Sequence, residues 1–136
     1  MTVSEYSNMM RILIADDSPQ VRGALRALIE QDSELIVCGE AVDGGDVVRR
    51  ARDLRPDLIL LDFQMPVMNG LQAAREIAKV ARDVPVLLCT VHLTGTLVGE
   101  ARRLGIHGAV SKSNSTEILN GVKALLRHEP FFCPTA

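Results

Sequence analysis

The sequence has no long apolar run, no excess of charge of one sign and no recognisable leader. Its longest apolar stretches have the length of a strand, so we expect no membrane-spanning segment. The N-terminus lacks a basic region followed by an apolar one, so we expect no signal peptide. The net charge is −2, and Lys and Arg are scattered apart from short pairs such as Arg49-Arg50. This pattern argues against direct binding of nucleic acid by this chain.

Cysteine and histidine, which bind transition metals or form disulfides, are also scarce. The three cysteines are odd in number and lack the spacing of metal or redox sites. Cys38 and Cys89 fall in strand-like segments, where we expect them to pack as small apolar side chains. The three histidines stand apart in the sequence and form no ligand cluster. A reduced, cytoplasmic setting is therefore expected.

What the sequence does have is a regular alternation of strand-like and helix-like segments. With 136 residues, 47% of them apolar, the chain can form one domain with a core of its own. Short apolar runs predict strands at residues 11–15, 35–41, 57–62, 84–90 and 107–111. Apolar residues at helical spacing predict helices at residues 18–31, 44–54, 69–81, 94–104 and 115–127. The polar residues 1–10 are expected to be flexible.

Five strands alternating with five helices predict an α/β fold, with a doubly wound five-stranded parallel sheet covered by helices on both faces. Ser18 is suited to cap the first helix and Pro19 to begin it, and Asn69 is suited to start the third. In sheets of this kind, ligands bind beyond the carboxyl ends of the strands, where the strand order reverses. The strand ends are therefore where chemistry is expected.

Polar side chains stand at four of the predicted strand ends. The first strand is followed by two acids, the third and fourth each end in a polar residue, and the fifth is followed by a lysine: Asp16, Asp17, Asp62, Thr90 and Lys112. Each has an ordinary explanation by itself, as a helix cap, a solvated loop residue, a strand threonine or a surface lysine. Ser18 already fills the cap position, however, and the five residues at one sheet edge favour a shared site.

The chemistry of such a site follows from its charges. Three clustered carboxylates repel one another and favour a hard cation, and Mg2+ takes one or two carboxylates together with phosphate oxygens. Lys112 adds one positive charge as a compact donor. A carboxylate neutralised in this way can attack an electrophilic phosphorus, as aspartyl-phosphate enzymes do. Thr90 would then donate a hydrogen bond to one phosphoryl oxygen, and Lys112 would pair with another.

Four segments resemble the receiver domain of bacterial two-component response regulators: ADDS (15–18), LLDFQMPVMNG (60–70), CT (89–90) and GAVSK (108–112). The resemblance covers residues 11–127 and implies a flavodoxin-like (βα)5 fold. It implies that Asp62 accepts a phosphoryl group from a sensor histidine kinase or phosphotransfer protein, that Thr90 and Lys112 sense that group, and that phosphorylation can lead to a homodimer. It also implies a Mg2+ site held by Asp16, Asp17, Asp62 and the backbone carbonyl of Gln64.

The chain departs from the receiver pattern three residues before the site lysine. Receivers usually carry an aromatic residue there, which swings inward when the threonine moves, but here the position is Ala109, so this readout is absent or relocated. The residue after the threonine is commonly small, whereas here Val91 would shield the phosphoryl group from water. Gln64 and His92 should flank the entry to the site.

The predicted helix at residues 94–104 is weak, because Gly95 and Gly99 each cost about 1 kcal/mol relative to Ala. A weak helix beside Thr90 is suited to move. We therefore expect phosphorylation to shift an equilibrium in residues 91–105, altering the face formed by this helix, the fifth strand and the last helix.

Residues 128–136 are expected to form a C-terminal tail or the start of a linker. Phe131 and Phe132 are two of only three phenylalanines, and a chain end does not normally expose paired aromatics. The segment resembles the linker of NarL/LuxR-like regulators, which carry a helix-turn-helix DNA-binding domain. Either the chain is the receiver of a longer protein, which would reach DNA only through that further domain, or it acts alone through protein contacts.

Two other functions are compatible with the site residues. The first is a Mg2+-dependent phosphatase or phosphotransferase that works through an aspartyl-phosphate. Such hydrolases typically need a second acid two residues after the nucleophile, and Gln64 occupies that position. The second is a binding scaffold with a vestigial site, which the presence of all five site residues disfavours.

Overall fold

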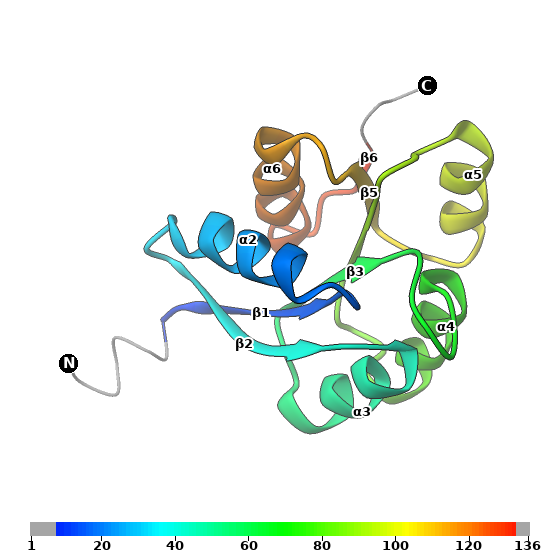
Figure 1. Cartoon of the computed structure of the whole chain (residues 1–136), viewed down its shortest axis with the longest axis horizontal. Coiled ribbons are helices and arrows are strands. Elements are labelled where there is room, and N and C mark those ends of the chain that lie inside the picture. The colour runs from blue at the N-terminus through cyan, green and yellow to red at the C-terminus, as the bar shows by residue number, and fades with distance from the viewer. Residues whose placement is uncertain (1–7, 133–136) are drawn as a thin grey trace.

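The described part of the chain has one sheet of six parallel strands in the order β2-β1-β3-β4-β5-β6, with helices on both faces (Figure 1). The computed structural model describes residues 8–132. The strands are β1 (Met10–Ala15), β2 (Leu35–Ala41), β3 (Leu58–Asp62), β4 (Val86–Thr90), β5 (Gly108–Ser111) and β6 (Phe131–Phe132). The helices are α2 (Pro19–Glu30), α3 (Gly44–Leu54), α4 (Gly70–Val80), α5 (Gly95–Arg103) and α6 (Ser115–Leu126). The predicted α/β fold and its five strand–helix pairs are confirmed.

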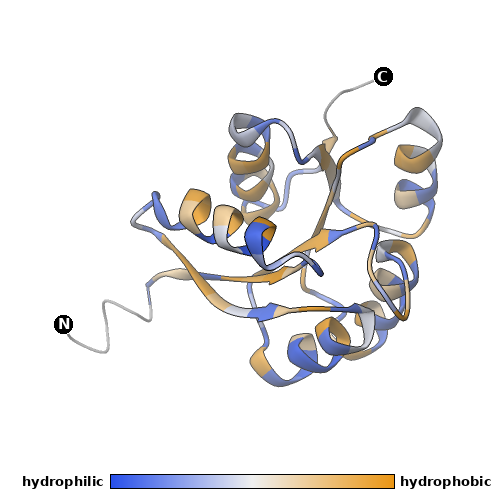
Figure 2. Cartoon of the chain, viewed as in Figure 1, coloured by the Kyte–Doolittle hydropathy of each residue, from blue (hydrophilic) through white to orange (hydrophobic). Residues whose placement is uncertain are grey.

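Helices cover both faces of the sheet, so the central strands are buried on both sides (Figure 1). In β3, Leu58 and Leu60 join the core beneath α2 and α6, whereas Ile59 and Leu61 join the core beneath α3, α4 and α5. Figure 2 shows apolar colour along the strands and hydrophilic stretches on the helices. Burial on both faces explains why the central strands are continuous apolar runs without polar alternation.

Each helix begins after a residue whose side chain accepts a hydrogen bond from the first helical turn. These caps are Ser18, Asp43, Asn69, Thr94 and Asn114. The predicted cap at Ser18 and the start at Pro19 are confirmed. A cap of this kind contributes about 1 kcal/mol. The cap residues therefore help to fix the point at which each strand-end loop ends and its helix begins.

The sheet has one strand more than the five that were expected. Phe131 and Phe132 pair with Gly108 and Ala109 of β5 as a short sixth strand, and Phe132 is buried. The part of the expected tail that the structure describes therefore packs on the sheet. A two-residue strand carries no periodic signal of its own, which is why the sequence pattern does not reveal it.

The remaining expectations concern the cysteines and the chain ends. Cys89 is buried among apolar side chains, and burial raises the pKa of its thiol to about 12, as expected for a packing residue. Cys38 is half-buried against the other core. Cys133 and the first seven residues lie outside the described residues. Within residues 8–132, the helices are too short or too polar to cross a membrane.

A network of charged side chains joins α2 to the end of β2. Glu40 lies 2.9 Å from Nε of Arg22 and 2.8 Å from Nη2 of Arg26. Arg26 also lies 3.7 Å from Glu30, one turn further along α2. Burial raises the pKa of Glu40, but hydrogen bonds from Arg26 and Arg22 outweigh it, so the pKa of this carboxyl lies below its usual value.

We expect Glu40→Gln to lower the free energy of unfolding at neutral pH by about 1 kcal/mol, because this partly exposed network loses its central charge. The pKa of Glu40 is lower in the folded protein than in the unfolded chain. The ionised carboxylate therefore stabilises the fold fully above the ordinary glutamate pKa, and this stabilisation is lost as pH falls through the pKa of Glu40 in the folded protein. Urea unfolding should therefore show a difference between the variant and the parent at neutral pH that shrinks in acid. Glu34→Gln, on an exposed loop, is the control and should match the parent at both pH values.

Candidate functional site

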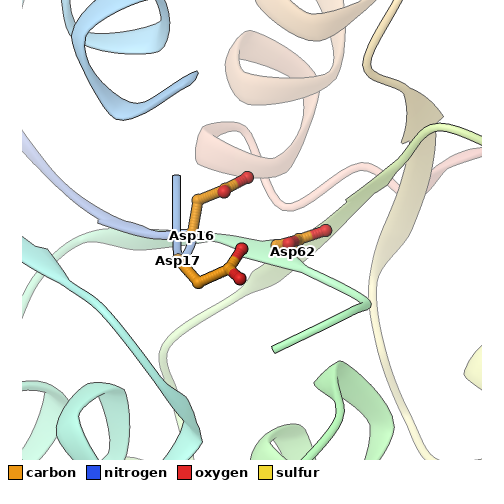
Figure 3. Close-up of side chains that lie close together, drawn as sticks. All are labelled: Asp16, Asp17 and Asp62. Atoms are coloured by element: carbon orange, nitrogen blue, oxygen red, sulfur yellow. The ribbon is translucent and has the colours of Figure 1, made fainter. Parts of the chain in front are cut away.

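The predicted site residues meet at the carboxyl edge of the sheet. Asp16 and Asp17 follow β1, Asp62 ends β3, and their carboxylate oxygens lie within 4.8 Å of one another (Figure 3). β1 and β3 are neighbours in the sheet, and β4 and β5 follow in order, so Thr90 and Lys112 arrive at the same edge. The predicted convergence of these five residues is what the structure shows.

Asp16 is held in place from two directions. Its Oδ1 atom accepts a hydrogen bond of 2.9 Å from the backbone N–H of Ser18, and its backbone carbonyl accepts one of 2.7 Å from the Arg22 guanidinium. The residue is 1% exposed, whereas Asp17 is exposed. Sequence reasoning missed Arg22, because an arginine in the first turns of a helix has no local feature that marks it as part of a site.

Lys112 lies between the two buried carboxylates. Its Nζ atom is 2.6 Å from Oδ2 of Asp16 and 3.0 Å from Oδ1 of Asp62. Burial lowers the pKa of Lys112, but the close ionic contacts with the Asp16 and Asp62 carboxylates outweigh it, so the pKa is raised and the side chain is an ammonium at neutral pH. The backbone N–H of Lys112 donates to the carbonyl of Thr90 at 2.9 Å, which ties the lysine to the end of β4.

Asp62 is the buried acid at the end of a strand whose other residues are all apolar. It is 5% exposed, and burial raises its pKa; the hydrogen bond from Lys112 lowers the pKa, and the charge of Asp16 raises it further. The backbone N–H of Gln64 donates to Oδ1 of Asp62 at 3.3 Å. The ionised form of Asp62 is therefore costly in the fold and depends on the cation beside it.

The donor set of this edge suits a hard divalent cation. The side chains of Asp16, Asp17 and Asp62 offer only oxygen atoms, which Mg2+ prefers. Oδ2 of Asp16 is buried and makes no well-directed hydrogen bond, although the Lys112 ammonium lies close to it. Three carboxylates and one ammonium leave an excess of negative charge, which a divalent ion would balance.

The loop after Asp62 has a strained and closely packed conformation. Val67 has a φ of 77°, and the N–H of Met68 donates to the carbonyl of Pro66 at 2.9 Å across it, which makes a γ-turn. A β-branched residue rarely adopts positive φ. Gly70 closes the loop, because a Cβ there would lie 2.6 Å from the carbonyl oxygen of Asp62. The Gly70 position thus requires glycine for the acid to stay where it is.

A hollow of about 320 Å³ opens beside Thr90, between the loops after β3 and β4. Gln64, Val91 and His92 line it, as does Glu100 of α5. Thr90 is 5% exposed and Val91 is 60% exposed. The hollow leaves room for α5 and its preceding loop to shift relative to Thr90.

Ala109 is fully buried in β5, three residues before Lys112. Its neighbour across the strand pair is Phe132 of β6, and both side chains belong to the core beneath α5. An aromatic ring therefore does lie beside the position where the sequence pattern lacked one, and it comes from the C-terminal strand.

We expect Asp62→Asn to raise the Tm at neutral pH by a few degrees when no divalent cation is added. The pKa of Asp62 is raised in the folded protein, so the contribution of this group to stability is largest below the ordinary aspartate pKa. That contribution is lost as pH rises through the pKa of Asp62 in the folded protein. The difference in Tm between Asp62→Asn and the parent should therefore vanish in acid. Added Mg2+ should stabilise the parent more than the variant, because the variant lacks one carboxylate. Thermal unfolding with and without Mg2+ measures both effects.

Asp53→Asn is the matched control, since Asp53 is an exposed acid paired with Arg52 on the surface. It should leave the Tm and its Mg2+ dependence unchanged. A lower Tm for Asp62→Asn, or equal stabilisation of both proteins by Mg2+, would contradict this account of the site.

Comparison with known proteins agrees with the geometry. The model of the response regulator receiver domain family matches residues 12–123. The transcriptional regulatory protein YxjL of Bacillus subtilis is 34% identical over 90% of this chain and 57% of its own length. Protein CcdB of the same organism is 34% identical over 88% of this chain and 100% of its own. The chain thus spans little more than half of one relative and the whole of another.

The fold is also similar to those of solved structures. A two-component response regulator of the LuxR family from Aurantimonas superposes with a TM-score of 0.89 at 31% identity, over 93% of this chain and 91% of that one. These matches favour the signalling function over the phosphatase alternative, for which they provide no support. The chain belongs to the response regulator receiver domain family, whose members act in phosphorylation-dependent signalling.

Proposed function

We propose that Asp62 is the phosphoacceptor of this domain and that a sensor histidine kinase, or a phosphotransfer protein, is the donor. The observation that supports it most directly is the position of Asp62: a buried carboxylate with raised pKa, 3.0 Å from the Lys112 ammonium and beside Asp16, in a chain of the receiver family. We also propose a cytoplasmic protein with a receiver spanning residues 11–127, which forms a homodimer on phosphorylation and reaches DNA only through a further domain.

In the reaction, a carboxylate oxygen of Asp62 forms a bond to phosphorus while the bond to the donor breaks. The donor atom is a nitrogen of phosphohistidine, or the acyl oxygen of a small acyl phosphate, and it leaves with the electron pair. Lys112 is already beside Asp62 and offsets the charge of the arriving phosphoryl oxygens. Thr90, at the end of the neighbouring strand, would donate a hydrogen bond from its hydroxyl to one of them.

Asp16, Asp17 and Asp62, together with the backbone carbonyl of Gln64, would hold Mg2+ at this edge. When bound, the ion supplies charge stabilisation for the phosphoryl group in transfer. The chain's own residues orient the acceptor: Gln64 N–H and Lys112 both contact Oδ1 of Asp62, which limits the directions in which the carboxylate can turn.

We expect incubation with acetyl phosphate and Mg2+ to add the mass of one phosphoryl group to the protein and to add none to Asp62→Asn. Intact-mass spectrometry measures this directly. The control is Asp57→Asn, directly before the other end of the same strand, where the side chain accepts a 2.7 Å hydrogen bond from the backbone N–H of Arg11 that an amide oxygen can also accept. That variant should be phosphorylated like the parent. Absence of uptake by the parent would instead favour a scaffold with a vestigial site.

We expect Val91→Ala to lose the phosphoryl group several-fold faster than the parent. The Val91 side chain directly follows Thr90 and lines the hollow beside it, so in the proposed function its two methyl groups would shield the phosphoryl group from water. The rate of loss is measured by intact mass after acetyl phosphate is removed. Val80→Ala, which shortens an exposed valine on α4, is the control and should not change the rate. An unchanged rate in Val91→Ala would reject a shielding role.

A further inference from the structure

The two residues of β6 pack on opposite faces of the sheet, each against a different helix layer. Phe132 is 7% exposed and lies in the core that contains Leu97 and Ala101 of α5. Phe131 packs against the other core, and a Cβ on Gly121 of α6 would lie 3.1 Å from its ring. The short strand therefore inserts one ring beneath α5 and the other beside α6.

Several backbone features fix the position of β6. After α6 the chain reverses through His128, whose φ is 63°. The N–H of His128 donates to Leu125 and that of Glu129 to Ala124, both at 2.9 Å, which is the hydrogen-bond pattern of a Schellman motif. The N–H of Phe131 then donates to the carbonyl of His107 at 3.1 Å. A Cβ on Gly108 would collide with the carbonyl oxygen of Phe131, so β5 has a glycine where β6 lies against it.

Phe132 provides part of the surface on which α5 rests. It pairs with Ala109, and because residues paired across parallel strands point to the same face, the small methyl group of Ala109 leaves room for the ring. The guanidinium carbon of Arg102, in the last turn of α5, lies 4.0 Å from the centre of that ring. A shift of α5 therefore changes the surroundings of Phe132 directly.

α5 has space to move on several sides. Besides the hollow next to Thr90, one of about 330 Å³ lies between α4 and α5, and one of about 410 Å³ lies against β6, with Arg102 and Phe132 in its wall. A Cβ on Gly95 would have no neighbouring atom within 4 Å, and the nearest atom to a Cβ on Gly99 would be a flexible arginine nitrogen at 3.7 Å. Packing thus does not require either glycine, and both weaken the helix.

We propose that Phe132 couples α5 to the C-terminal strand, so that phosphorylation of Asp62 loosens β6. The link between α5 and β6 rests on the packing described above. The link to phosphorylation rests on the proposed function: donation by Thr90 to a phosphoryl oxygen draws the loop after β4 toward the site, and α5 moves with that loop away from the ring of Phe132. By thermodynamic reciprocity, the free energy of β6 docking also affects the free energy of phosphorylation of Asp62.

The first experiment needs no phosphorylation. Amide hydrogen exchange is followed by mass spectrometry in the parent, in Phe132→Ala and in Phe131→Ala. Both variants shorten a ring of β6, but only Phe132 contacts α5. We expect exchange in residues 95–103 to be several-fold faster in Phe132→Ala and unchanged in Phe131→Ala. Residues 19–30 of α2 report on global folding and should exchange equally in all three proteins.

The second experiment repeats the measurement with acetyl phosphate and Mg2+, with the phosphorylated fraction read from intact mass. In the parent, phosphorylation should speed exchange several-fold in residues 128–132. This response should persist in Phe131→Ala relative to its own unphosphorylated form and be lost in Phe132→Ala.

The outcomes separate the coupling from the proposed function. Equal α5 exchange in the two variants would overturn the coupling, whether or not the protein takes up phosphate. Phosphorylation that leaves exchange in residues 128–132 unchanged would overturn it as well. No gain of mass in the parent would count against Asp62 as phosphoacceptor, and with it against the effect of phosphorylation on β6, while faster α5 exchange in Phe132→Ala would still support the packing link.

Discussion

The ammonium of Lys112, placed between the carboxylates of Asp16 and Asp62, is the interaction on which the functional edge depends. Two buried acids this close together repel each other, and each alone would be costly to ionise away from water. The lysine reaches them from β5, across the end of β4, and meets acids at the ends of β1 and β3. A parallel sheet brings the carboxyl ends of all these strands to the same edge. The site therefore depends on this fold class.

The same arrangement leaves the negative charge at this edge of the sheet only partly neutralised. One ammonium faces three carboxylates, one of them exposed to solvent at Asp17. A site with this balance attracts a divalent cation and then an anionic phosphoryl group. Thr90 and the loop after β4 lie next to a hollow, which leaves the helix that follows room to shift without disturbing the central strands. Buried strands position Asp62, and the proposed switch would act through the helix that has the more open surroundings.

The sequence was sufficient to predict strands β1 to β5, the five helices and the five polar residues at the strand ends, because these have local signals. Apolar runs mark the strands, helical spacing marks the helices, and a polar residue after an apolar run marks a strand end. Other features have no local signal. Arg22 contacts the backbone of Asp16 from a helix, and its sequence neighbourhood resembles that of any surface arginine. The positive φ of Val67 is imposed by its loop, against the preference of a β-branched residue.

The sixth strand shows the same limit more clearly. In the sequence, Phe131 and Phe132 resemble the start of a linker, but their partners in β5 lie more than twenty residues earlier in the chain. Gly108 and Gly121 are an indirect sign of this pairing. The absence of a side chain leaves space for the carbonyl of Phe131 at Gly108 and for its ring at Gly121. In a related chain, side chains larger than hydrogen at both positions would be evidence that the segment after the last helix leaves the domain instead of returning to the sheet. The two glycines thus offer a way to sort relatives by the path of their C-terminal segment.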